Sequence, residues 1–312
     1  LVYLSSSFSG HLCDPAKTPY NFVYSSDYST KARATVQYWY DNYWMKDPRY
    51  KADRDAGRKP RLVVFGMFAS TYVTAPLEAL KDQAEMLGFE FGEDQDVSLF
   101  ALDTKSQVLA VKETPPDFVW HGNTTMSVAT AMKDFYALGL SGPGKKTMHA
   151  VNCWGLDENT MKLAGPASEE ALAAAVCAYF VWDYPWKDTV VEYCQKIHPG
   201  TPLDARLIRT VQGWVKVTIM VQALRAMDDA GELDLSPAAL ATTRAELKKY
   251  LEADFSSFSS QLGLPEFATT ATDHRPSGKI VIAQIEDQKI VNRGILDMKA
   301  KYSDLWSEWL GW

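Results

Sequence analysis

Short apolar runs alternate with helix-like runs between residues 61 and 160, and this alternation constrains the fold more than any other feature. The expected strands are residues 61–66, 96–102, 117–121 and 147–152. The expected helices between them are residues 75–88, 104–113 and 124–140. Apolar strands separated by helices form a parallel sheet that helices cover on both faces. The pattern therefore predicts an α/β fold.

The rest of the chain adds elements on both sides of this region. Further strands are expected at 1–4, 20–24 and 176–182, and further helices at 185–198, 203–231 and 236–251. Ser26 or Asp27 can cap a helix that follows the second of these strands. Residues 46–60 are charged and are expected to form an exposed insertion. A late hairpin is expected from 279–285 and 290–291.

Composition excludes several classes of protein. The 312 residues are 46% hydrophobic and 23% charged, which is typical of a globular chain of one large domain or two domains. The longest unbroken apolar run is 171–182, shorter than the roughly 18 residues that a membrane-spanning helix needs. The net charge is −7 and no basic stripe is present, which argues against nucleic acid as a partner.

The motifs of common catalytic and cofactor sites are missing. The chain has no GxSxG, HExxH or GxGxxG, and the glycine-rich run 139–146 ends on Lys146 where a phosphate loop needs Ser or Thr. We therefore expect no catalysis, no metal and no cofactor. A further interpretation is that the protein is an α/β enzyme. Such an enzyme would need a nucleophile and a base close together in the folded chain. Four cysteines outside any CxxC motif allow either four buried thiols or two disulfides.

Ligands of open α/β sheets bind at the carboxyl ends of the strands, and this rule selects candidate residues. The segments that follow the expected strands are rich in hydroxyls and aromatic rings and poor in charge. Such residues offer neutral hydrogen bonds and apolar walls, as small-molecule pockets do. They favour binding over acid–base chemistry.

The order of several segments resembles the type I periplasmic substrate-binding proteins of ABC transporters, in the branched-chain amino acid (Leu/Ile/Val) group. The segments that carry the likeness are LVYLSSSFSG, TPYNFVYSSDYSTKARATVQYW, RLVVFGMFASTYVTAPLEALKDQAEMLGFEF, PPDFVWHGNTTMSVATAMKDFYALGL, VQGWVKVTIMVQALRAM and DHRPSGKIVIAQIEDQKIV. The likeness extends to about residue 292. The sequence departs from the family at Gln288, where Gly is usual, and in the insertion 46–60.

The resemblance implies two α/β lobes, with parallel sheets flanked by helices and a hinge of three crossing strands. Lobe one would be residues 1–22 and 184–277, and lobe two residues 23–183 and 278–312. The opening strand would then be an interior strand of lobe one, so we expect the N-terminal part of that lobe to be missing from this chain.

The resemblance also implies where the ligand binds. It places a ligand loop of small residues at Ser6, Ser7, Phe8 and Ser9. It places further ligand contacts at Tyr72, Asn123, Thr124 and Trp154. Alternatives are a solvated turn for the serines and a helix cap for Thr124.

Amino-acid binders of the family usually carry an acid where this chain has Cys153 or Trp154, with Asp157 farther along. A ligand ammonium buried without an acid costs several kcal/mol. We therefore expect an apolar or aromatic carboxylate, or an amide, rather than a plain α-amino acid.

By this resemblance the protein is an extracytoplasmic solute-binding protein that captures a small organic ligand between two lobes and delivers it to an ABC permease. It would be periplasmic, or extracellular and lipid-anchored in a Gram-positive organism, and would meet the membrane only through the permease. The alternative is a ligand-sensing domain of a receptor or amide-responsive regulator. A periplasmic location would favour the disulfides Cys153–Cys177 and Cys13–Cys194.

Overall fold

The computed structural model describes residues 3–312, which form two compact units. The first unit contains the chain up to residue 27, residues 176–280 and residues 297–312, and the second contains residues 28–175 and 281–296. The chain thus changes unit four times, where sequence reasoning expected three crossings. The fourth change arises because the C-terminal segment joins the first unit, whereas it was expected in lobe two.

The second unit is built on one sheet, in the order β10-β9-β8-β7-β6-β3-β4, with β5 also beside β3. β3, β4, β5, β6, β7 and β8 run parallel, and β9 is antiparallel to β8. The strands are β3 Arg61–Gly66, β4 Glu90–Phe91, β5 Gln95–Asp96, β6 Phe118–His121, β7 Met148–Val151, β8 Leu172–Ala174, β9 Lys279–Glu286 and β10 Lys289–Asp297. The predicted α/β fold is confirmed.

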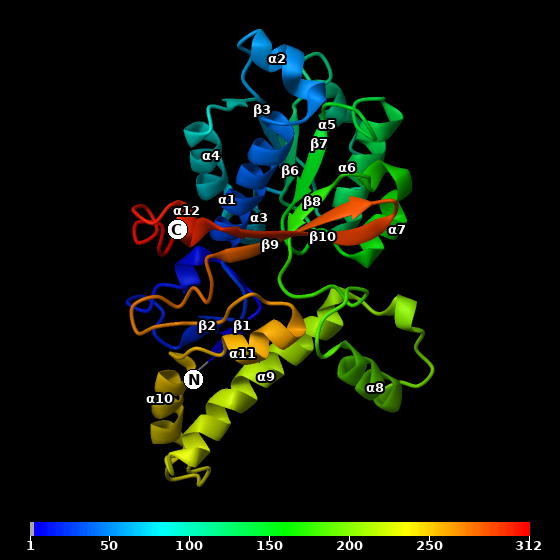
Figure 1. Ribbon diagram of the computed structural model, residues 1–312. Coiled ribbons are helices and arrows are strands. Elements are labelled where there is room, and N and C mark those ends of the chain that lie inside the picture. Colours follow the sequence, from blue (N-terminus) through cyan, green and yellow to red (C-terminus); the bar gives the residue numbers. More distant parts are fainter. Residues whose placement is uncertain (1–2) are drawn as a thin grey trace. The chain divides into compact units, whose positions relative to one another are not determined.

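Strand register decides which side chains meet which helices. Leu62 pairs with Phe118, so these two side chains share a face of the sheet, against which Trp39 of α1 packs. Val63 and Val119 point to the other face and join a buried cluster with Phe135 of α6. Helices therefore cover both faces of this sheet, as the parallel strands require (Figure 1).

The helices of the second unit occupy most of the expected positions. They are α1 Tyr28–Trp39, the π-helical turn η2 Tyr40–Trp44, η3 Pro48–Tyr50, α2 Lys51–Asp55, α3 Thr71–Thr74, α4 Leu77–Met86, α5 Lys105–Ala110, α6 Thr125–Ala137, α7 Glu158–Ala164 and η4 Gly165–Ser168. The expected insertion 46–60 contains η3 and α2. Most of it is accessible to solvent, and Tyr50 is its buried anchor.

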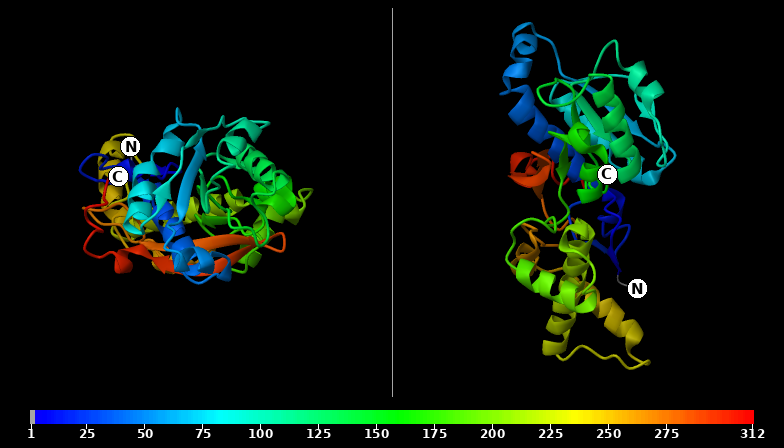
Figure 2. Two further views of the ribbon diagram at one scale, coloured as in Figure 1. Left: turned by 90° about the horizontal axis from the view of Figure 1, so that it is seen from above. Right: turned by 90° about the vertical axis from the view of Figure 1, so that its right-hand side faces the viewer.

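The first unit joins a small sheet to a group of helices. β1 Tyr3–Ser5 and β2 Asn21–Val23 are parallel, with Leu4 opposite Phe22. Leu1 and Val2 of the expected first strand lie outside the described residues. The helices are η1 Gly10–Leu12, α8 Lys187–Ile197, η5 Leu203–Ala205, α9 Ile208–Asp229, α10 Leu240–Leu251, α11 Ser256–Ser259, η6 Ser260–Leu262 and α12 Met298–Lys301. α9 and α10 pack against each other (Figures 1 and 2).

The C-terminal tail packs on the first unit. The backbone oxygen of Trp312 lies so close to Gly10 that a Cβ there would stand 1.7 Å from it. His11 Nδ1 is 2.6 Å from the carbonyl oxygen of Gly311. The Arg275 guanidinium lies 3.8 Å from the centre of the Trp306 ring. The tail is thus held through backbone oxygens at its end and through the Trp306 ring.

Two expected strands are wrong. Residues 176–182 form no strand; β8 ends at Ala174, and the backbone N–H of Ala178 donates to Leu262 of the first unit. A short apolar run is typical of a buried segment, but periodicity alone does not show whether that segment is a strand. Of residues 96–102 only Asp96 belongs to a strand, and Phe100 and Leu102 are more than four-fifths exposed.

Candidate ligand-binding site

Asn123 connects the segments that follow three strands of the second unit. It is buried at the end of β6. Its Oδ1 accepts from the backbone N–H of Met67, after β3, at 2.9 Å. Its Nδ2 donates to the carbonyl oxygen of Val97, after β5, at 2.9 Å. The amide is thus engaged within the protein, which gives Asn123 a positioning role.

Two glycines allow α3 to sit against these strand ends. A Cβ on Gly66 or on Gly122 would lie 2.6 Å from Cγ1 of Val73, closer than real Cβ contacts come. Both positions therefore require glycine for close approach. Val73 is completely buried there, and this contact fixes the neighbouring Tyr72.

Tyr28, Tyr72 and Trp154 form an aromatic cluster in the second unit. Trp154 Nε1 donates to the Tyr28 hydroxyl at 2.8 Å, and its backbone N–H donates to the Tyr72 hydroxyl at 3.2 Å. The Tyr28 and Tyr72 rings meet edge to face at 5.4 Å. The structure thus brings together Tyr72 and Trp154, which are 82 residues apart. Sequence reasoning missed Tyr28, which gave no sign beyond its place at the start of an expected helix.

Thr124 and Asp157 precede α6 and α7, and their side chains differ in whether they cap the helix. Thr124 is the N-terminal cap of α6, yet its side chain makes no capping hydrogen bond. Asp157 caps α7 by accepting from the backbone N–H of Thr160 at 2.8 Å, and it also accepts from the Thr125 hydroxyl. Asp157 therefore stabilises the N-terminus of α7.

The serine loop, residues 5–9, follows β1 in the first unit. Ser5 Oγ accepts from the backbone N–H of Ser7 at 2.9 Å, and Ser6 Oγ accepts from Lys216 Nζ at 3.1 Å. Ser7 is exposed, and Ser9 precedes η1 without a side-chain capping bond. Phe8 is completely buried and packs edge-on against Tyr24 at 4.9 Å. Its side chain therefore anchors the loop, and the ligand contact expected for Phe8 stays a prediction.

All four cysteines are buried and lie outside any disulfide. Cys13 Sγ donates to the carbonyl oxygen of Ser9 at 3.7 Å, and Cys177 Sγ donates to that of Ile208 at 3.9 Å. The two disulfides that a periplasmic location favoured are wrong, and the interpretation as four buried thiols is confirmed.

His121 and His149 form a buried pair beneath the strand ends. His121 Nε2 lies 2.9 Å from His149 Nδ1, and both rings contact buried phenylalanines. Burial and the neighbouring imidazole lower the pKa of His121, and burial lowers the pKa of His149 to about 3. The two rings therefore form a neutral, buried pair. Within residues 3–312, no three His, Cys, Asp or Glu side chains are grouped to hold a metal.

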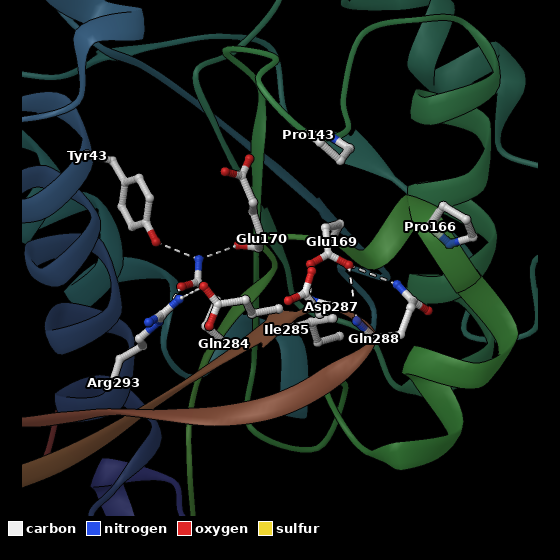
Figure 3. A pocket seen from close by; sticks show the side chains of 11 residues that line it. Tyr43, Pro143, Pro166, Glu169, Glu170, Gln284, Ile285, Asp287, Gln288 and Arg293 are labelled. Atoms are coloured by element: carbon white, nitrogen blue, oxygen red, sulfur yellow. Dashed lines mark hydrogen bonds and ion pairs between the residues drawn. The ribbon is translucent and has the colours of Figure 1, made fainter.

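A pocket of the second unit lies beside the β9–β10 turn (Figure 3). Its volume is about 520 Å³. Gln284 Nε2 donates to the Tyr43 hydroxyl and to the backbone oxygen of Glu170, and Arg293 donates to Gln284 Oε1. The polar side chains that line it thus bond mainly to one another.

The comparisons with known proteins agree with this architecture. The family model described as "Periplasmic binding protein" matches residues 1–289. The chain belongs to this periplasmic binding protein family. No curated protein matches the chain in sequence.

Solved structures of periplasmic binding proteins share the fold. A branched-chain amino acid ABC transporter protein from Thermus thermophilus with bound valine is 19% identical, with a TM-score of 0.76 over 96% of this chain and 73% of that one. A fatty acid ABC transporter substrate-binding protein from Thermomonospora curvata is 20% identical, with a TM-score of 0.70 over 95% and 69%. A solute-binding protein from R. palustris in complex with benzoate is 18% identical, with a TM-score of 0.65 over 92% and 68%.

Family membership carries a general functional meaning. Periplasmic binding proteins of ABC transporters bind solutes and are not enzymes, and membership implies a small-molecule ligand, a permease partner and an extracytoplasmic location. In the part of the chain that the structure describes, no helix is long and apolar enough to span a membrane.

Proposed function

We propose that this protein is an extracytoplasmic solute-binding protein that captures one small organic acid and delivers it to an ABC permease. The ligand would contact the serine loop of the first unit and the aromatic cluster of the second. The observation that carries the proposal is the aromatic cluster itself, held at the strand ends where ligands of α/β sheets bind. Ser6, Ser7, Ser9, Tyr72, Thr124 and Trp154 are the proposed ligand contacts.

The chemistry of these residues favours an apolar or aromatic carboxylate over an α-amino acid. Trp154 and Tyr72 supply apolar ring surface, and the exposed Ser7 and the uncommitted Thr124 hydroxyl supply neutral hydrogen bonds. The Asp157 carboxylate accepts a hydrogen bond from the Thr160 backbone N–H at the N-terminus of α7. Valine, benzoate and fatty acids, named for the three relatives, all carry a carboxylate.

Isothermal titration calorimetry with benzoate, octanoate, leucine and benzamide tests this proposal. We expect saturable binding of benzoate or octanoate with one site per chain. Trp154→Ala should weaken that binding at least about tenfold, because a buried aromatic contact is worth on the order of 1.5–3 kcal/mol. Trp186→Ala, a tryptophan outside both proposed segments, is the matched control. Tight leucine binding together with no response to either acid would refute the proposed ligand class.

A further inference from the structure

Another pocket of the second unit, which we call the amino-end pocket, lies where parallel strands begin. Its volume is about 520 Å³, a size typical of small-molecule pockets. Arg58, Lys59 and Arg61 at the start of β3 line it, together with residues 114–117 before β6 and residues 146–147 before β7. The pocket therefore lies at the opposite edge of the sheet from the carboxyl ends of these strands.

Two features of the sequence that the proposed function does not use meet in the amino-end pocket. The insertion 46–60 supplies Asp53 and Lys59, and the glycine-rich run 139–146 supplies Lys146. Lys146 Nζ lies 2.5 Å from Asp53 Oδ2, so an ion pair joins the two segments. The insertion and the glycine-rich run thus build one pocket, although they lie far apart in sequence.

Two acids of this pocket are already paired with neighbouring cations. Asp117 is buried and accepts from both terminal nitrogens of Arg58, at 2.7 and 2.9 Å, and from the backbone N–H of Arg61 at 2.9 Å. Asp53 pairs with Arg58 at 2.9 Å as well as with Lys146. Asp53 and Asp117 therefore offset the charges of Arg58 and Lys146.

Lys59 and Arg61 have no such acid. Within residues 3–312, neither side chain forms an ion pair or a hydrogen bond, and Arg61 Nε is buried without an acceptor. Glu90 lies opposite Arg61 in the β3–β4 register and also lines the pocket, but the two form no ion pair. Gly92 makes room for the guanidinium, because a Cβ there would lie 3.0 Å from two of its nitrogens. A guanidinium buried in part without an acceptor is costly, and a bound anion would supply one.

We propose that the amino-end pocket is a second binding site, which takes a small organic phosphate monoester. Arginine binds phosphate with two parallel hydrogen bonds, and lysine adds a point charge. The two positive charges of Arg61 and Lys59 match a phosphate monoester, which carries about −1.5 to −2 at pH 7. Pro115, Pro116 and Leu140 line the same pocket and offer an apolar wall for the organic part.

Isothermal titration calorimetry with phenyl phosphate at about pH 7.5 and constant ionic strength tests this inference. Inorganic phosphate, which lacks the ring, and phenol, which lacks the charge, are titrated in parallel. We expect saturable binding of phenyl phosphate that is tighter than the binding of either part. Arg61→Gln should weaken it by about ten- to a hundredfold, the value of hydrogen bonds to a charged group.

Further variants separate loss of the site from loss of folding. Lys59 is exposed, so Lys59→Gln keeps the fold, and it should weaken phenyl phosphate binding by about two- to fivefold. Lys51→Gln, which removes an exposed lysine that pairs with Asp55 in the same insertion, is the matched control and should change nothing. Circular dichroism checks that each variant is folded.

Three results would overturn the inference. They are no saturable binding of phenyl phosphate by the folded wild type, binding that Arg61→Gln leaves unchanged, and equal binding of inorganic phosphate and phenyl phosphate. Loss of binding in Trp154→Ala but not in Arg61→Gln would place the probe at the aromatic cluster instead. Because no residue of the amino-end pocket is a proposed contact of the organic acid, the proposed function stands or fails separately.

Discussion

The Asn123 side chain shows how one residue can join the segments that follow three strands. Its amide joins the segments after β3 and β5 to the end of β6. The rule that ligands bind at the carboxyl ends of strands selected this position. The partners of the Asn123 amide could not be predicted, because they belong to loops that come together only in the folded chain. The sequence alone does not distinguish a polar side chain that contacts a ligand from one that bonds to the backbone.

Asn123→Ala should destabilise the protein by about 2–4 kcal/mol, because it leaves a backbone N–H and a backbone carbonyl without their partner. Urea denaturation followed by circular dichroism measures this loss. Thr124→Ala, which removes a hydroxyl that makes no capping bond, should change stability by less than about 0.5 kcal/mol. An Asn123→Ala variant as stable as the wild type would show that the amide does not hold the strand ends.

The His121–His149 pair predicts a specific pH dependence of stability. Both pKa values are lowered in the folded protein, that of His149 to about 3, whereas an unfolded histidine titrates near about 6.5. Between these values the unfolded chain binds more protons than the folded one, so stability is full above about pH 6.5 and falls as the pH drops. At pH 5 the loss is about 2 kcal/mol for each histidine.

Urea denaturation at about pH 7.5 and about pH 5 measures this loss. His149→Asn keeps a side chain that can hydrogen-bond His121 but removes one titrating group, so the fall in stability between the two pH values should shrink by about half. His198→Asn, at an exposed histidine, is the control and should leave the difference unchanged. An undiminished difference in His149→Asn would contradict the assignment of the pH dependence to this pair.

At the scale of elements, the β9–β10 turn depends on unusual backbone conformations. Asp287 has φ 50° and Gln288 has φ 55°, the left-handed region in which glycine is favoured. The Gln288 side chain offsets part of this strain by donating to the carbonyl oxygen of Gly165 and to the Glu169 carboxylate. The sequence predicted the hairpin, and these contacts provide a physical reason why glutamine is accepted where the family usually has glycine.

Gln288→Val should destabilise the protein by about 1–2 kcal/mol relative to Gln288→Gly, because a β-branched residue is strained at positive φ and neither variant keeps the hydrogen bonds. Thermal and urea denaturation of the two variants measures the difference. Equal stability of the two variants would show that the turn does not impose this backbone conformation.

Elements with strong periodicity were predicted well, and those decided by distant contacts were not. The helices near 125–137 and 208–229 and the strand Arg61–Gly66 follow from local patterns. Residues 176–182 are equally apolar but form a loop of the first unit, in which residues 176–180 are buried and Val181 is exposed. An apolar run favours burial, but whether it forms a strand depends on a neighbouring strand with which it can pair.

At the scale of the whole molecule, the order of the expected strands and helices along the chain predicted the fold better than any single motif. The order of elements predicted the α/β fold, which the structure and the family model confirm. The return of residues 297–312 to the first unit was not predicted, because it depends on packing against Gly10 and His11, far away in sequence. For the candidate site, Tyr72 and Trp154 were predicted to share one site, whereas Tyr28 was missed because it belongs to a separate helix.

The tail contacts give a prediction about the first unit. Gly10→Val would place side-chain atoms where the backbone of Trp312 now lies, so the tail must move. We expect a loss of stability of about 1–3 kcal/mol, the usual cost of overpacking, and increased proteolysis of residues 302–312. Gly200→Val, at a glycine with open space around it, is the control. Unchanged stability and unchanged proteolysis would contradict the packing of the tail on Gly10.

A crystal structure of the protein purified without added ligand tests the central claim most directly. We predict density for one small organic acid, with its carboxylate at Ser7 and Ser9 and its apolar part against Tyr72 and Trp154. A ligand bound elsewhere, with no density at either the serine loop or the aromatic cluster, would contradict the proposed site and the proposed function.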